Sequence, residues 1–196
     1  MVKRRIKDRW HNSTPEDAAR DVTAEKNLSE QASALAYIVW RQALNTAINL
    51  HAEDFEYEND RQRIAVINEF VAFQIQHIDR LYHGYSEYEG REQLLVGVCE
   101  NVAEQVQDNL TDIDGPRNYR KPFLELLNDR FSVYSNFQYQ EREPSFEVLR
   151  YLGHNVLTIL GDDQTNRWVI DHVVAIEAPE LADQIARSLS RLFSQE

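Results

Sequence analysis

Long stretches in which apolar residues recur every three or four positions dominate this chain, and few residues in it can interrupt a helix. The 196 residues include only 6 glycines and 5 prolines. Most of these lie where the apolar spacing changes, and nowhere do apolar and polar residues alternate for long enough to indicate a strand. The sequence therefore predicts an all-α fold, a single-domain bundle of about six to eight helices with no sheet.

Capping signals give the approximate bounds of these helices. Thr14, Pro15 and Asp17 form a helix start, Pro144 and Pro179 stand at first-turn positions, and Gly161 ends a helix. We expect residues 1–12 to form a separate arm and residues 13–196 to form one domain. The predicted helices cover residues 14–24, 28–51, 59–83, 88–112, 119–138, 144–161, 166–177 and 179–194.

The two longest helices differ in their apolar faces. Residues 28–51 have a very wide apolar face, which predicts a central helix. Residues 59–83 have a narrower one, and a set of polar residues lies opposite it. This set consists of Asn68, Glu69, Gln76, Asp79 and Arg80.

The charge is negative overall but unevenly placed. The net charge is −12, and residues 1–12 carry a local +4, so the remaining residues carry −16. A nucleic-acid surface needs clustered Lys and Arg, so this charge disfavours a nucleic-acid partner except through the basic N-terminal arm. The simpler interpretation of these residues, which we favour, is a solvated tail.

Cysteine content and hydropathy indicate the cellular compartment in which we expect the protein. Cys99 is the only cysteine, which excludes an internal disulfide framework, and its apolar neighbours predict a buried thiol rather than a nucleophile. The chain shows neither an apolar signal region nor a run that could span a bilayer. We therefore expect a cytoplasmic protein without a membrane partner.

Motifs that would identify an enzyme are missing. The sequence contains no Gly-rich phosphate loop, no G-x-S-x-G elbow, no H-E-x-x-H and no E-x-x-H pair. It therefore indicates no metal site and identifies neither a cofactor nor a catalytic residue.

Several polar residues fall on otherwise apolar helix faces, and these are the candidate ligand-binding residues. A buried Arg needs an anion or carbonyl partner, and a His there can ligate a metal, transfer protons or simply hydrogen-bond in the core. Each residue also has the simpler interpretation of a satisfied polar group in or near the core. The candidates are His51, Gln74, His77, Arg130 and His172.

Two functions stay open at this point. The absence of catalytic motifs and the wide apolar faces favour a non-enzymatic interaction, regulatory or oligomeric adaptor protein, with a homo-oligomer or a protein partner. The alternative is a small-ligand- or metal-binding bundle, possibly an enzyme, whose interhelical site is lined by His and Arg.

Overall fold

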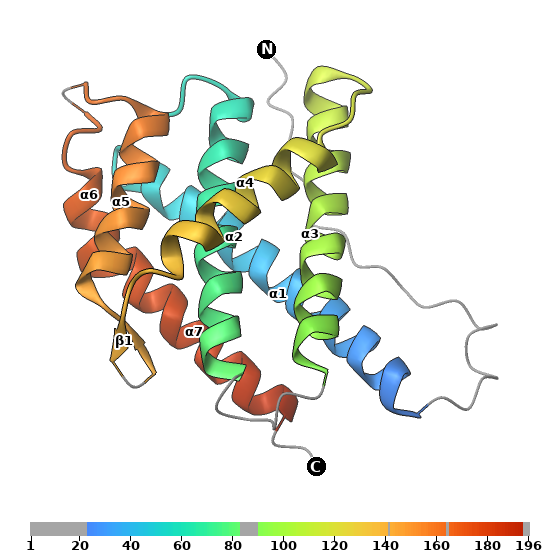
Figure 1. Ribbon diagram of the computed structural model, residues 1–196. Helices are drawn as coiled ribbons and strands as arrows, with labels where there is room; N and C mark the ends of the chain where they lie inside the picture. Colours follow the sequence, from blue (N-terminus) through green and yellow to red (C-terminus); the bar gives the residue numbers. More distant parts are fainter. Residues whose placement is uncertain (1–22, 83–89, 141, 164, 194–196) are drawn as a thin grey trace.

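The computed structural model confirms the all-α prediction (Figure 1). It describes residues 23–82, 90–140, 142–163 and 165–193, so the predicted arm and residues 14–22 of the first predicted helix lie outside the described residues. One helical domain fits these residues. Its elements are α1 (Thr23–Ala52), α2 (Asp60–Tyr82), α3 (Arg91–Asp114), α4 (Arg120–Tyr134), α5 (Phe146–Leu160), α6 (Val169–His172), a π-helical turn (Val173–Glu177) and α7 (Ala178–Phe193).

The segment between α4 and α5 differs from the prediction in detail. Here β1 (Tyr139–Gln140) and β2 (Glu143–Pro144) form a two-residue antiparallel pair, where a loop was expected. Pro144 lies in β2 rather than in the first turn of α5. The helix begins after Ser145, whose extended backbone (ψ 162°) is typical of an N-cap residue.

A second difference is the junction before α7. The predicted break ahead of Pro179 is absent, because the chain continues from α6 through the π-helical turn into α7. Proline lacks the N–H that would bond the carbonyl of Ala175, four residues back. The wider turn at Val173–Glu177 replaces the α-helical pattern at the place where Pro179 cannot support it.

Helix α2 lies in the middle of the bundle. It packs against α1, α3, α5 and α7. Helix α4 crosses in front of it (Figure 1). Its apolar face meets the wide apolar face of α1, where Leu35, Val39 and Trp40 are fully buried. Burial of these large side chains supplies the main stabilisation of the fold.

The polar side of α2 is also buried, which its amphipathic pattern does not indicate. Asn68, Glu69 and Gln76 are only 9%, 1% and 6% exposed. Helices α3 and α4 cover this side, so the polar residues need partners within the protein. Only Asp79 and Arg80 of the set remain partly exposed.

Helices α1 and α3 approach each other closely at Gly97. A Cβ atom added at this position would lie 2.8 Å from the Cβ atom of Ala32. The absence of a side chain at Gly97 therefore sets the distance between these helices. No helix in the described ranges combines the length and the apolar character needed to cross a bilayer.

Candidate functional site

Gln74 and His77, two of the predicted site residues, lie in the core on α2. The Gln74 Nε2 atom donates hydrogen bonds to the carbonyls of Val39 and Phe70, each at 3.2 Å. The His77 ring stacks between Phe73, with centroids 6.2 Å apart, and Tyr139, at 5.8 Å. Both side chains are at most 1% exposed, so neither contacts a surface cavity.

Burial decides the protonation of His77. It lowers the pKa of the ring to about 4, and a hydrogen bond to the backbone of Ala182 opposes that shift only in part. The ring is therefore neutral at pH 7. A neutral, enclosed imidazole between two aromatic rings acts as a packing group here.

Arg130 reaches across from α4 to Glu69 on α2. Its Nε and terminal NH2 atoms donate to the two carboxylate oxygens of Glu69, both at 2.7 Å. The hydrogen bonds from Glu69 are the main cause of the raised pKa of Arg130, and the guanidinium also lies 6.0 Å from the centroid of the Tyr151 ring. This bidentate pair neutralises the buried Glu69 and ties α4 to the bundle.

His51 and His172 each contact a different part of Phe55. The Nδ1 atom of His51 is 3.4 Å from the Phe55 carbonyl, and the His172 ring lies 5.3 Å from the Phe55 ring. His172 Nε2 is also 3.2 Å from a carboxylate oxygen of Glu177. Among the described residues, Phe55 is thus a shared neighbour of these two histidines.

The five predicted residues therefore do not form one site. Gln74 and His77 are enclosed in the core, Arg130 pairs with Glu69, and His51 and His172 lie around Phe55. Within the described residues, no cluster of three or more His, Cys, Asp or Glu side chains could hold a metal ion.

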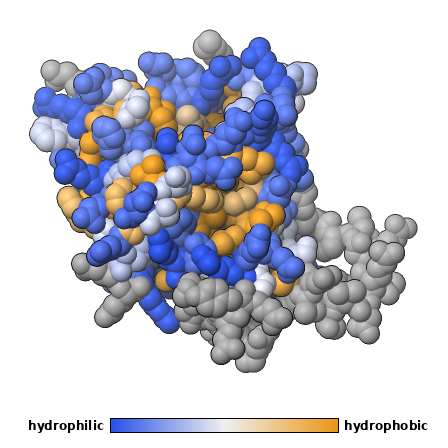
Figure 2. Space-filling view, viewed as in Figure 1, coloured by the Kyte–Doolittle hydropathy of each residue, from blue (hydrophilic) through white to orange (hydrophobic). Residues whose placement is uncertain are grey.

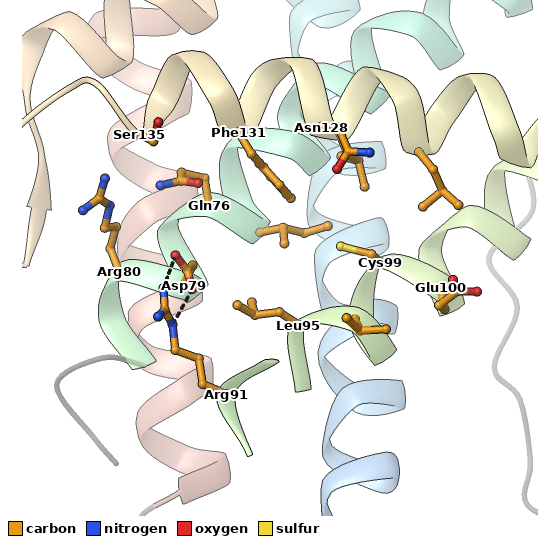
Figure 3. A pocket seen from close by; sticks show the side chains of 14 residues that line it. Gln76, Asp79, Arg80, Arg91, Leu95, Cys99, Glu100, Asn128, Phe131 and Ser135 are labelled. Atoms are coloured by element: carbon orange, nitrogen blue, oxygen red, sulfur yellow. Dashed lines mark hydrogen bonds and ion pairs between the residues drawn. The ribbon is translucent and has the colours of Figure 1, made fainter. Parts of the chain in front are cut away.

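A groove of about 720 Å³ between α2, α3 and α4 is a different candidate (Figure 3). Phe131 points from α4 toward Leu95 and Cys99 on α3, and Gln76 projects from α2 at the polar end. The apolar side chains in its lining are Ile75, Leu95, Val96, Cys99, Leu124, Leu127 and Phe131.

One end of the groove carries charged groups. Arg91 donates two hydrogen bonds of 2.7 Å to the carboxylate of Asp79, which links α3 to α2. The guanidinium of Arg80 lies 5.5 Å from the centroid of the Tyr139 ring, and its buried Nε atom has no acceptor among the described residues. This end of the groove therefore presents a cation that no carboxylate of the described chain neutralises.

The rest of the groove opens to solvent. Figure 2 shows apolar side chains gathered in the middle of the face that α4 crosses, surrounded by polar ones. Val96, in the groove wall, is 53% exposed. Exposed apolar surface of this kind, rimmed by polar groups, marks a binding surface more often than a structural element.

Cys99 contributes a thiol to this surface without nucleophilic character. Burial raises its pKa to about 11, so the thiolate is scarce at neutral pH. The sequence predicted a buried thiol, whereas Cys99 is only partly buried and lines the groove.

The sequence prediction missed the groove because its residues belong to three helices and follow each helix's ordinary apolar spacing. Leu95 and Cys99 were expected to be core residues, and Phe131 likewise. Only the crossing of α4 over α2 and α3 leaves them lining an open surface. Comparison of the chain with protein-family models, with curated proteins and with solved structures finds no match.

Proposed function

We propose that this protein is a non-enzymatic binding protein whose groove between α2, α3 and α4 receives one face of an amphipathic helix from a partner protein. The observation that carries the proposal is the open apolar groove of about 720 Å³ with a polar rim. Helix-in-groove binding uses an apolar surface of this kind, and the partner contributes apolar residues one helical turn apart.

The length of the groove supports this occupant. The lining residues run from 91 to 100 on α3 and from 124 to 135 on α4 and its C-cap residue Ser135. At the rise of an α-helix these segments are about 14 Å and about 16 Å long, which equals about three turns of a partner helix. Such a helix would place apolar side chains about one turn apart along the groove.

The charged end of the groove gives the partner helix a direction. Arg80 lacks a carboxylate partner in the described structure, while Arg91 is already paired with Asp79. A carboxylate at the corresponding end of the partner helix would form a charge-assisted hydrogen bond with Arg80. We therefore expect an acidic residue in the partner at that end.

The alternative of a ligand site lined jointly by His51, His77, Arg130 and His172 has less support. The His77 ring lies between Phe73 and Tyr139, and Arg130 already donates two hydrogen bonds to the carboxylate of Glu69. Neither lines the groove. An anion clamp would need Arg130 to release a buried carboxylate, which is costly.

A peptide-display selection on the full-length protein tests the proposal. The library contains random peptides of sixteen residues, and the selected peptides are then measured in solution against wild type and two variants. Val96→Glu places a charge in the groove wall. Ile176→Glu is the matched control, because Ile176 is 50% exposed and lies outside the groove.

The expected result is a set of peptides with apolar residues at helical spacing that gain helicity on binding. Val96→Glu should weaken their binding by about tenfold or more, since it leaves a charge against apolar surface, and Ile176→Glu should not. Arg80→Gln should weaken only those peptides that carry an acidic residue at one end. Peptides that bind Val96→Glu as tightly as wild type would refute the proposal, and so would a groove filled by a second copy of this chain.

A further inference from the structure

The polar end of the groove between α2, α3 and α4 contains hydrogen-bond donors that lack acceptors. Gln76 and Arg80 lie one turn apart on α2, and both line this end (Figure 3). The Nε atom of Arg80 is buried and has no acceptor among the described residues. The Tyr139 ring, whose centroid lies 5.5 Å from the guanidinium, favours this position of the cation. Buried donors in proteins are normally satisfied, so this end of the groove calls for an acceptor from outside.

Gln76 adds a second donor at the same place. Its side chain lines the groove although the residue is only 6% exposed, and no hydrogen bond joins its amide to another residue of the described ranges. In Figure 3 the amide lies between Ser135 and Asp79, on the side of the groove where Arg80 lies. An amide has two N–H donors, so Gln76 and Arg80 together present donors to one small space.

The charge at this end suits one carboxylate group. Its cations are Arg80 and Arg91, and its carboxylate is Asp79, which accepts both of its hydrogen bonds from Arg91. Two cations and one carboxylate leave a single positive charge, that of Arg80. A carboxylate neutralises this charge. A doubly charged phosphate group would leave a negative charge beside Asp79.

The two ends of the groove favour one direction of the partner helix. Glu100 lies at the end opposite Arg80, where it pairs with Arg120 (Figure 3). The C-terminal end of a helix has a partial negative charge and carbonyl groups without internal donors, and the N-terminal end has a partial positive charge and free N–H groups. Only the C-terminal end therefore brings acceptors to Gln76 and Arg80.

We propose that the polar end of the groove binds the C-terminal carboxylate of a partner protein whose chain ends in the helix that the groove receives. Arg80 and Gln76 are its donors. The proposal rests on the proposed function, because it requires a helix in the groove. A chain end places a carboxylate directly beside the unpaired carbonyl groups of the last turn, so both donors find acceptors within the same small space.

A pair of peptides that differ only at the chain end tests this proposal. Random peptides of sixteen residues, displayed with a free C-terminus, are selected on the full-length protein. The tightest binder is then synthesised as the free acid and as the C-terminal amide, each with a fluorophore at the N-terminus for anisotropy titrations. We expect the amide to bind about tenfold or more weakly than the acid, because a charged hydrogen bond is lost.

Three variants locate the carboxylate. Arg80→Gln should weaken binding of the acid by about tenfold or more, and Gln76→Met by about threefold to tenfold, while both should bind the amide as wild type does. Neither substitution breaks a hydrogen bond of the described structure. Arg187→Gln is the control: it removes a positive charge from α7 outside the groove, where Arg187 pairs with Asp183, and should bind both peptides as wild type does.

A spin label measures the direction of the helix independently of its carboxylate. A nitroxide coupled through an amide bond to the N-terminus of the free-acid peptide should broaden amide signals of the ¹⁵N-labelled protein around Glu100. Signals around Arg80 should stay sharp. The reverse pattern overturns the proposal.

The titrations separate the remaining possibilities. Preference for the acid that is lost in Arg80→Gln and Gln76→Met supports the chain-end site. Equal binding of acid and amide overturns it, and if Arg80→Gln weakens both forms alike, an acidic side chain supplies the carboxylate. Val96→Glu shows whether the groove itself stands: equal binding of both forms that Val96→Glu abolishes leaves the groove as the binding surface. A selection without binders, or peptides that bind Val96→Glu as they bind wild type, removes the groove and the chain-end site together.

Discussion

The ion pair between Arg130 and Glu69 gives the sharpest prediction about stability. Replacing Arg130 with Met keeps the apolar stem and removes the guanidinium, which leaves Glu69 charged at 1% exposure. Removal of one partner from a buried ion pair costs about 3–5 kcal/mol. The Arg130 side chain is 23% exposed, so water can reach part of the site. We therefore expect a loss near the lower limit, about 3 kcal/mol.

Two further variants show whether the loss comes from the uncompensated charge. The double variant Glu69→Met/Arg130→Met removes both charges, and we expect it to recover most of the loss, to within about 1 kcal/mol of wild type. Arg61→Met breaks an exposed pair with Asp114, in which Arg61 is 63% exposed, and should cost less than about 1 kcal/mol.

Urea unfolding followed by circular dichroism measures all four proteins, with the free energy extrapolated to water and the slopes compared. A loss below about 1 kcal/mol in Arg130→Met would refute the reasoning, because exposed pairs cost that little. A double variant less stable than Arg130→Met would refute it as well, since the loss would then come from packing and not from an unpaired charge.

Three more predictions follow from single residues. Because the pKa of His77 is about 4 in the fold and near 6.5 when exposed, the unfolded chain binds a proton between these values and the fold does not. The contribution of neutral His77 to the free energy of unfolding should therefore be fully present above pH 6.5 and should fall by about 3 kcal/mol as the pH drops to 4. Urea unfolding at several pH values should show this loss in wild type but not in His77→Phe. Parallel pH curves for the two proteins would contradict the prediction. Gly97→Ala should lower stability by about 1–3 kcal/mol, measured by urea unfolding, because the added methyl group meets Ala32 at 2.8 Å; unchanged stability would show that α1 and α3 separate easily. Alkylation of Cys99 at pH 8 should be about 100-fold slower than that of an ordinary thiol, since its pKa is about 11; reaction at the rate of the urea-unfolded chain would contradict the burial of the thiol.

The sequence was sufficient to predict the helical class and the approximate position of most helices. The end of α5 at Gly161 agrees with a local signal, because the effect of a glycine extends over only a few residues. The π-helical turn before Pro179 was not predicted. The proline signal indicated a break between two helices, whereas the chain stays helical from α6 through this turn into α7.

The candidate sites depend on which helices lie next to each other, and the sequence pattern does not contain this information. Glu69 appears on the polar side of its helix, and only the crossing of α4 buries it against Arg130. Leu95 and Phe131 follow core spacing, yet they line an open groove. Periodicity identifies the apolar face of a helix but not whether another helix covers it.

The binding groove is the central claim, and an NMR titration of the full-length, ¹⁵N-labelled protein with one selected peptide tests it most directly. We expect the largest amide shifts at residues that line the groove on α2, α3 and α4, around Ile75, Val96 and Leu127. The same shifts should disappear in Val96→Glu. Shifts that map instead to α1 and α7, or that persist unchanged in this variant, would contradict the assignment of the groove as the binding surface.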